Sequence, residues 1–573
     1  MFFSNLFLAL LFLGGTCLGK AYPGNSPGGS LRDKSSLSNS YLFPTDASHK
    51  INSGFADYRP GHFHGGMDIS TNGKIGYPVF AAKSGYVYRI SVSPFGYGKM
   101  ILLRHSDSTF TVYGHLSAFS DEIELKVEAA QEREDKYGVD LRLDPGEIRV
   151  DRGEVIAYTG ASGVGGPHLH FEVRDRDLSF IDPLVFAALD VPDYRTPRIF
   201  SVAVRGFVSG EPKVSKVAKS GNSYVAKETF HMTEPFYFVI HGADSYGGNF
   251  KRSPKHILLQ IDSKDFINLN LTHFDADEYL DVSSLVDLRL SKRLKTYYAL
   301  CVNRAIPFSV FTPDTPLSGL IDGNIANGVH YYEISIEDEA GNRAAIKGTF
   351  VLDIPPSASK SSTSKPDIVV APFKEKVFNL SPDLTLRFRE NSFARDIKVE
   401  ASLLSSTSFE IESQKEMLRK KVELTWKVND TALGLYRKSR RGWSFVDSRN
   451  DGHLLTAKIG YQTGQFALLR DETPPIVGKI RFSRKDPFYK SVAPKDFGRV
   501  FVYFKVADHL SGINTDKILL KVGRKEYFCE YDMDKHAAVC QVEANQLKSM
   551  GKVTVAVSDN AGNERTVVSR IKF

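Results

Sequence analysis

Short apolar segments separated by turn residues recur along the chain and favour a fold built mainly of strands. Between residues 41 and 190 they include "YPVFAA", "GYVYRISV", "KMILLRH", "FTVYGHL", "EVIAYTG" and "LHFEVRD". Their length and their β-branched and aromatic content predict strands, and turns such as Asn72-Gly73 separate them. One segment, 121–138, is charged, rich in helix formers and closed by Gly138, so we expect a helix there.

The first forty residues differ in composition from the rest of the chain. Residues 1–19 contain the apolar run "FFSNLFLALLFLGG" followed by small residues, which predicts a secretory signal peptide. We favour simple cleavage over lipoprotein anchoring through Cys17, whose preceding residues form a poor lipobox. Residues 20–40 are rich in Gly, Pro and Ser and predict a flexible lead-in. We therefore expect an exported protein of the periplasm or cell envelope, without a later membrane span.

A chain of 573 residues is too long for one hydrophobic core, and an internal repeat divides its second part. "FYFVIHGADSYGG" (236–248) is similar to "FVYFKVADHLSG" (501–512), and both 331–350 and 553–573 contain Asp-x-Ala-Gly-Asn. That pentapeptide predicts a hairpin turn in which Gly and Asn adopt positive φ, and it resembles the turn of bacterial immunoglobulin-like domains.

The predicted domains follow from these signals. We expect a globular domain at 41–190, an immunoglobulin-like β-sandwich at 193–354, a linker at 355–367, a β-rich domain at 368–470 and a second sandwich at 472–573.

Charge and cysteine content restrict the functional classes. The net charge of +7 is spread along the chain without a basic block, which argues against nucleic-acid binding. Cys529 and Cys540 flank a hairpin-like stretch and are able to pair in an oxidising compartment, but the sequence alone does not decide this. We expect Cys301 to be a buried small apolar residue.

Three segments of the N-terminal domain carry histidines in a pattern that suggests a metal site. In "GPHLHFEV" (166–173), His168 and His170 share one face of a predicted strand because side chains alternate. "HFHGGMD" (62–68) places His64 four residues before Asp68, and "YGHL" (113–116) adds His115. Two imidazoles and one carboxylate suit a catalytic zinc, which keeps a further position for water. The two remaining histidines would orient that water and stabilise an oxyanion.

The ordered motifs "HGGMD", "YGHL" and "PHLHFEVRD", with "GYPVFAAKSGYV" and "GEVIAYTGASG" between them, resemble the LytM/lysostaphin-type zinc metallopeptidases of family M23 over residues 48–187. The resemblance implies an antiparallel β-sheet with an open groove, a Zn²⁺ ion and cleavage of peptide cross-links in bacterial peptidoglycan. It implies metal ligation by His64, Asp68 and His170, and catalysis by His115 and His168. The expected fold class is mainly β: an M23 sheet with a helical insertion, followed by immunoglobulin-like sandwiches.

Several nearby residues have alternative roles. His62 rivals His64 as a ligand, although family members often carry a non-ligating histidine there. We expect His105 to be structural or groove-lining, and Tyr113 to pack or to reach the groove. We place Glu172 on the strand face opposite His170, as a solvated or core-edge acid. The insertion at 117–152 is a candidate lid or wall beside the groove.

Two other classes of function compete with a peptidoglycan peptidase. One is a non-catalytic M23-fold activator or scaffold that regulates another cell-wall hydrolase. The other is an adhesion protein in which the sandwiches are the working part. The presence of all five site residues favours the enzyme. By analogy alone, we expect the C-terminal region to contact a cell-envelope protein partner or to act as a spacer.

Overall fold

The computed structural model of the chain describes residues 41–571 apart from 60, 188, 190, 208, 222, 246–251, 281, 292–294, 302–307, 311–318, 356–368, 371–373, 391, 393–396, 414–417, 419, 441, 461–462 and 493–498. The predicted signal peptide and lead-in, and residues 356–367 of the predicted linker, lie outside the described residues. Among the described residues, no helix is both long enough and apolar enough to cross a membrane.

The described chain is mainly β, which confirms the predicted fold class. The N-terminal region (residues 41–190) forms one antiparallel sheet whose main path runs β1 (Ile51–Ser53), β4 (Met67–Ser70), β13 (His168–Arg174), β9 (Phe110–Phe119), β8 (Lys99–His105), β7 (Gly85–Val92) and β10 (Val139–Arg142). Short strands β6 (Pro78–Phe80), β11 (Arg149–Val150) and β12 (Val155–Thr159) pair beside this path.

The predicted helix forms as α2 (Asp121–Glu134) and ends before Gly138. Its first turn is acidic, which suits the positive end of the helix dipole. Asp135 takes a left-handed conformation (φ 49°) and ends the helix, a role that we had assigned to Gly138. Ile123, Val127 and Ala130 are buried in the core of the N-terminal region, so one face of α2 covers that core.

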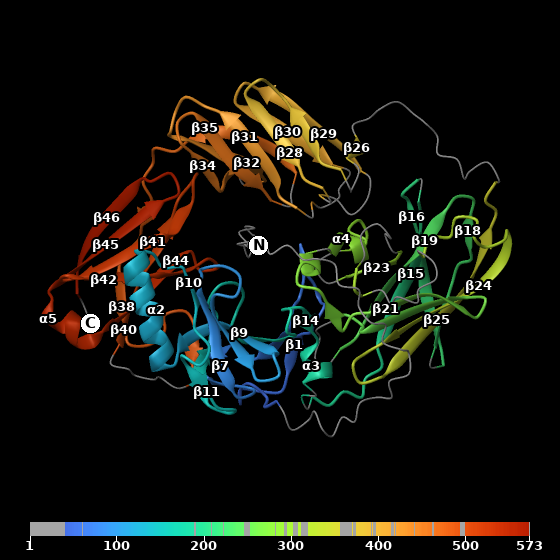
Figure 1. Cartoon of the computed structure of the whole chain (residues 1–573), viewed down its shortest axis with the longest axis horizontal. Helices are drawn as coiled ribbons and strands as arrows, with labels where there is room; N and C mark the ends of the chain where they lie inside the picture. Colours follow the sequence, from blue (N-terminus) through green and yellow to red (C-terminus); the bar gives the residue numbers. More distant parts are fainter. Residues whose placement is uncertain are drawn as a thin grey trace.

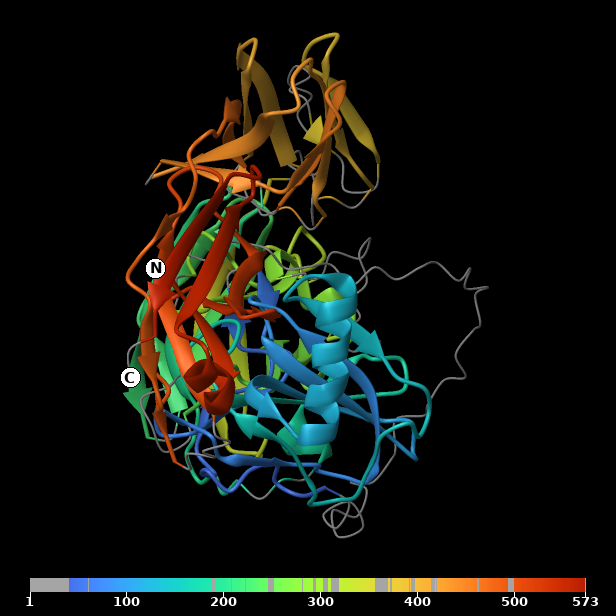
Figure 2. The same ribbon diagram turned by 90° about the vertical axis from the view of Figure 1, so that its left-hand side faces the viewer.

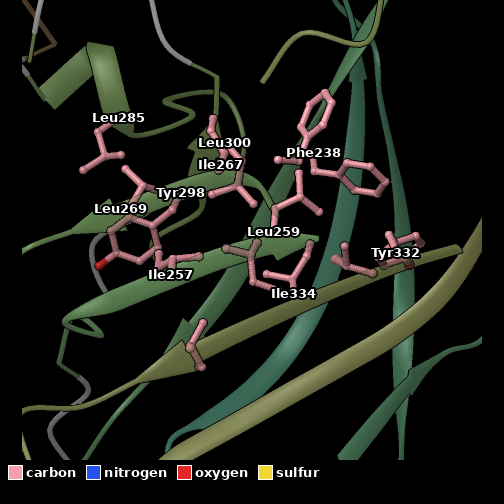
Figure 3. Close-up of a cluster of buried hydrophobic side chains, with 14 of the residues drawn as sticks. Phe238, Ile257, Leu259, Ile267, Leu269, Leu285, Tyr298, Leu300, Tyr332 and Ile334 are labelled. Carbon is pink, nitrogen blue, oxygen red and sulfur yellow. The ribbon is translucent and has the colours of Figure 1, made fainter. Parts of the chain in front are cut away.

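The first module (residues 193–354) contains a second large sheet. Its main path runs β21 (Lys264–Asn270), β20 (His256–Ile261), β24 (Gly328–Glu337), β25 (Arg343–Leu352), β17 (Ser223–Ala226), β16 (Pro212–Ser220), β15 (Arg198–Gly206), β19 (Phe236–Ala243) and β23 (Tyr298–Leu300). Alternate residues of β20 point inward, as its apolar periodicity requires. Figure 3 shows Ile257 and Leu259 in this core, together with Leu269, Tyr298 and Ile334.

The middle region (residues 368–470) forms two sheets whose side chains meet in one apolar cluster. The first contains β26 (Val369–Val370), β29 (Ile397–Ser405), β30 (Ser408–Ser413), β36 (Gly464–Arg470), β32 (Leu433–Ser439) and β33 (Gly442–Val446). The second contains β27 (Lys376–Asn379), β28 (Leu384–Phe388), β31 (Val422–Lys427), β35 (Leu454–Ile459) and β34 (Ser448–Asn450).

The last module (residues 472–573) also pairs two sheets around one core. One contains β37 (Ile476–Val477), β40 (Arg499–Ala507), β44 (Ala537–Glu543) and β43 (Glu530–Asp532), and the other contains β42 (Lys525–Phe528), β41 (Ile513–Val522), β45 (Lys552–Asp559) and β46 (Glu564–Arg570). A disulfide joins Cys529 and Cys540, both buried. In the first module, Cys301 is half-buried against an apolar cluster, whereas we expected it to be buried.

The N-terminal region lies between the first and last modules (Figures 1 and 2). On one side, β14 (Phe180–Ile181) pairs with β13 of its own region. It also pairs with β22 (His273–Phe274) of the first module. On the other, β5 (Lys74–Ile75) pairs with β39 (Lys490–Ser491) of the last module, which lies beside α2 in both views. The chain thus returns to its N-terminal region after passing through the middle region.

Candidate functional site

Three predicted ligands converge where β4 meets β13. The register places Asp68 directly opposite His170, and His64 lies in the turn that leads into β4. His64 Nε2, Asp68 Oδ1 and His170 Nδ1 form a triangle with edges of 2.9, 3.0 and 3.0 Å. The side chains are mostly buried, with Asp68 the most exposed at 14%. The structure therefore brings together the residues that the motifs selected.

The glycines between His64 and Asp68 make this approach possible. A Cβ atom on Gly66 would lie 2.2 Å from the backbone oxygen of Phe171, which is closer than any real contact. Only glycine therefore lets the turn lie against β13 at this point.

Hydrogen bonds fix which nitrogen each histidine presents to the triangle. His64 Nδ1 lies 2.7 Å from the carbonyl oxygen of Gly54, and that oxygen only accepts, so Nδ1 carries the proton. His170 Nε2 lies 2.9 Å from Glu172 Oε1 and by the same reasoning is the protonated nitrogen of the neutral ring. The lone pairs of His64 Nε2 and His170 Nδ1 therefore face the Asp68 carboxylate.

This arrangement fits a metal ion. Burial raises the pKa of Asp68, but the neighbouring histidines outweigh burial and hold its pKa well below the usual range. Burial lowers the pKa of His170, but hydrogen bonds to Asp68 and Glu172 outweigh it and raise the pKa to about 9. Protonation of His170 alone would not resolve this arrangement, because the lone pair of His64 Nε2 would still lie 2.9 Å from Asp68 Oδ1. A shared cation satisfies all three donors at once, and they are the only His-containing group of possible metal ligands among the described residues.

His115 and His168 lie beside the triangle. His115 has φ 59°, and the pairing of β9 with β8 shifts register around it, so a bulge turns its side chain out of the regular alternation. Its ring centroid lies 4.5 Å from that of His168 and 5.8 Å from that of His170. His168 Nε2 lies 3.5 Å from Asp68 Oδ1. The two predicted catalytic histidines thus share one side of the cluster.

Backbone carbonyls orient both of these rings. His115 Nδ1 lies 2.9 Å from the oxygen of Ser162, and His168 Nδ1 lies 2.7 Å from that of Gly166. Each Nδ1 therefore donates its proton, and each Nε2 is the basic nitrogen of the neutral ring. Burial lowers the pKa of both histidines, that of His115 well below its usual range, so both are neutral at pH 7.

Our placement of Glu172 on the opposite face was wrong. Residues two apart on a strand share a face, so His170 and Glu172 point the same way and their side chains are hydrogen-bonded. Burial raises the pKa of Glu172, but Arg174, His170 and the hydroxyl of Tyr97 outweigh it and lower the pKa to about 2. Arg174 Nε and the Tyr97 hydroxyl donate to this carboxylate at 2.7 and 2.5 Å. Glu172 is thus a fixed anion that orients His170.

Sequence reasoning also missed the groups that support His64 and Asp68. Arg59 lies 3.4 Å from Asp68 Oδ2, which leaves Oδ1 facing the histidines. Asp57 accepts hydrogen bonds from Ser53 Oγ and the Gly54 amide, and so holds the turn whose carbonyl binds His64. These contacts join turns, and no periodic pattern in the sequence indicates them.

The competing residues lie elsewhere. The His62 ring contacts Tyr279 of the first module, with ring centroids 6.1 Å apart, and His62 is not in the metal-ligand group. His105 is buried between the Ser84 carbonyl and the Thr111 hydroxyl, and burial lowers its pKa to about 4. Tyr113 is fully buried in the core and accepts a hydrogen bond from the Ala82 amide. His105 and Tyr113 therefore have structural roles in the buried interior of the N-terminal region.

The insertion at 117–152 contacts the last module. Gly138 donates its amide proton to Asp516 Oδ1 at 2.8 Å, and Lys517 binds Asp135. Residues of α2 and of the last module line a common cavity. The insertion therefore connects the N-terminal region to the last module.

Comparison with known proteins agrees with these motifs. Residues 62–132 match the model of Peptidase family M23. The DD-carboxypeptidase/endopeptidase Mpg of Neisseria meningitidis serogroup B is 33% identical over 112 residues, which are 19% of this chain and 20% of that protein. The chain thus spans about a fifth of the length of this curated relative.

Two further proteins are similar to part of the chain. Lipoprotein NlpD of Yersinia enterocolitica is 28% identical over 112 residues, which are 20% of this chain and 91% of that protein. A crystal structure of a zinc-containing peptidase from Vibrio cholerae is 28% identical, covers 27% of this chain and 41% of its own, and has a TM-score of 0.19.

Proposed function

Because the chain carries a domain of peptidase family M23, we propose that it is a zinc metalloendopeptidase that hydrolyses peptide cross-links of bacterial peptidoglycan. Zinc would be held by His64, Asp68 and His170, and His115 and His168 would act on the reacting groups. The observation that carries the proposal is the triangle of three converging lone-pair donors with two further histidines beside it.

Zinc bound to this triangle would supply a Lewis acid and lower the pKa of a bound water to about 7. The remaining chemistry belongs to the chain itself. Glu172 and the Gly54 carbonyl fix the two ring orientations, a support that ligating histidines commonly have. Each of His115 and His168 directs a basic Nε2 away from its carbonyl partner, where it can take a proton or, once protonated, donate to an oxyanion.

We further propose export to the cell envelope, with peptidoglycan peptides as substrate. The apolar N-terminal run supports export. The Cys529–Cys540 disulfide supports an oxidising compartment.

The test uses the full mature chain, measuring bound zinc by mass spectrometry and released muropeptides by chromatography. His64→Ala and Asp68→Ala are expected to lose zinc and turnover together. His115→Ala and His168→Ala are expected to keep most of the zinc while turnover falls at least about 100-fold, the usual contribution of a positioned acid or base. His62→Ala, in the same segment but outside the triangle, is the matched control and should retain zinc.

Other results would reject parts of this proposal. A folded, zinc-loaded chain that releases nothing from peptidoglycan would favour the non-catalytic activator. Full turnover in the presence of chelator would show that the reaction needs no metal. Full turnover in His115→Ala would show that His115 is not catalytic.

A further inference from the structure

Two groups of three aspartates recur at equivalent places in the first and last modules. Asp193, Asp244 and Asp338 each offer a carboxylate oxygen, and these oxygens lie within 4.8 Å of one another. The same is true of Asp471, Asp508 and Asp559. We call these groups the first and second acidic triads.

The triads come from the same three positions of each module. One member lies in the segment that enters the module, at Asp193 and at Asp471. The second directly follows β19 or β40, and is Asp244 or Asp508. The third begins the Asp-x-Ala-Gly-Asn turn, as Asp338 or Asp559.

The turn holds its aspartate in the same way in both modules. Asp338 Oδ1 accepts the amide protons of Ala340 and Asn342, and Asn342 Nδ2 donates to Oδ2. Asp559 accepts the corresponding three hydrogen bonds. The turn asparagine also reaches the carbonyl of the entering aspartate, at 3.5 Å in the first module and 3.1 Å in the last. The motif thus builds one arrangement twice.

The first triad contains an unsatisfied buried carboxylate. Asp244 is only 2% exposed, and neither of its side-chain oxygens makes a hydrogen bond of normal geometry within the described residues, nor does Asp193 Oδ2. Buried polar groups are otherwise almost always satisfied. The carboxylates therefore need a proton or a cation.

Both triads lie at joints between parts of the chain. Arg252 pairs through its backbone with Asp244 and contacts Glu339 through its side chain. It also lies next to Gly54 of the N-terminal region, where an added Cβ would be 3.0 Å from Arg252 Cδ. At the second triad, Asp471 directly follows β36, the last strand of the middle region. A ligand bound at either triad would therefore fix how one part of the chain meets the next.

We propose that each acidic triad binds a calcium-like divalent cation and stabilises its joint. Carboxylate oxygens without nitrogen or sulfur donors suit a hard cation, and calcium accepts irregular sets of oxygen ligands. Two sites of one design account for the recurrence of the three aspartates at the same places in both modules.

The test is calorimetric titration of the zinc-loaded full chain with Ca²⁺, with thermal unfolding followed in parallel. We expect two Ca²⁺ per chain and a Tm that rises with Ca²⁺ concentration. Asp244→Asn should abolish one binding event, Asp508→Asn the other, and the double variant both. Asp193→Asn, at a half-buried position, is the second variant for the first triad. Asp322→Asn, at an exposed position outside both triads, is the matched control and should still bind two.

The proposal is overturned if no Ca²⁺ binds at millimolar concentration, or if every variant still binds two ions. In either case a proton or Arg252 would neutralise Asp244. One bound ion that Asp244→Asn removes would establish the first triad and overturn the second. Zinc content and peptidase turnover are measured separately, so failure here does not bear on the proposed function.

Discussion

The first and last modules both contact the N-terminal region (residues 41–190), but they do so with different chemistry. Phe274 of the first module packs against Phe55, Phe63 and Phe180 with ring centroids 4.7–5.9 Å apart, inside one continuous core. Lys255 is buried and pairs with Asp182 at 2.8 Å. The last module mainly uses ion pairs, Lys99–Glu530, Asp135–Lys517 and Glu128–Arg499, with Phe528 partly buried against the core.

Each interface also reaches a different side of the candidate site. Ser253 of the first module donates its amide proton to Asp57, which holds the turn beneath His64. On the other side Lys99, paired with Glu530, donates its amide proton to Ser162, whose carbonyl orients His115. The apolar interface thus supports a proposed metal ligand, whereas the polar interface supports a proposed catalytic histidine. We expect the first module to be firmly packed on the N-terminal region, and the last module to be able to detach from it.

The largest effect is expected for Phe274→Ala. Deleting a buried phenylalanine costs about 3–5 kcal/mol, and this one fills space shared by two domains. Amide exchange at His64, whose N–H binds the Asp57 carbonyl, should accelerate together with exchange in the first module. Phe409→Ala, equally buried but in the middle region, is the matched control and should leave His64 protected. Unchanged exchange at His64 would mean that packing of the first module does not stabilise the N-terminal region around His64.

Lys255→Met is expected to cost about 3 kcal/mol, because it leaves the Asp182 carboxylate buried without a cation to balance its charge. The double variant Lys255→Met/Asp182→Asn should recover much of the loss, since no charge stays buried and the amide oxygen can still accept the Leu184 amide proton. Equilibrium unfolding in urea measures both. If the single and double variants lose the same free energy of unfolding, the Lys255–Asp182 pair contributes packing but no electrostatic stabilisation.

Acid is expected to weaken the core that both modules contact. Burial lowers the pKa of His105 to about 4, from the ordinary histidine value of about 6.5, so the unfolded chain binds the proton more readily. The stability contributed by neutral His105 is complete above pH 6.5 and is lost as the pH falls towards 4, by about 2 kcal/mol at pH 5. Unfolding of His105→Gln over the same pH range should lack this component, whereas His453→Gln, at an exposed position of the middle region, should retain it.

Much of the site followed from local sequence. Strand alternation placed His168 and His170 on one face, and the glycines between His64 and Asp68 indicated a tight turn, as the structure shows. The same alternation, applied correctly, would also have placed Glu172 beside His170. The bulge at His115 and the contacts of Arg59, Tyr97 and Ser162 had no local signal, because they depend on which turns meet in space.

The interfaces were still harder to predict. Lys99 and Glu530 lie far apart in the sequence, and nothing in the composition around either residue distinguishes a partner from an ordinary solvated charge. The insertion at 117–152 was recognisable as a helix, but whether it would cover the groove or contact another module depended on residues near the end of the chain.

The smallest effect is expected for Asp516→Ala, which removes the acceptor for the Gly138 amide at the last module. A contact of this kind is worth about 1 kcal/mol, so global unfolding should barely change. Amide exchange at Gly138 should accelerate, and raising the salt concentration should accelerate it further, because the remaining ion pairs are partly exposed and screened. Thr515→Ala, at the neighbouring position of β41, is the matched control. If the exchange rate at Gly138 changes neither with salt concentration nor in Asp516→Ala, the last module is held as firmly as the first.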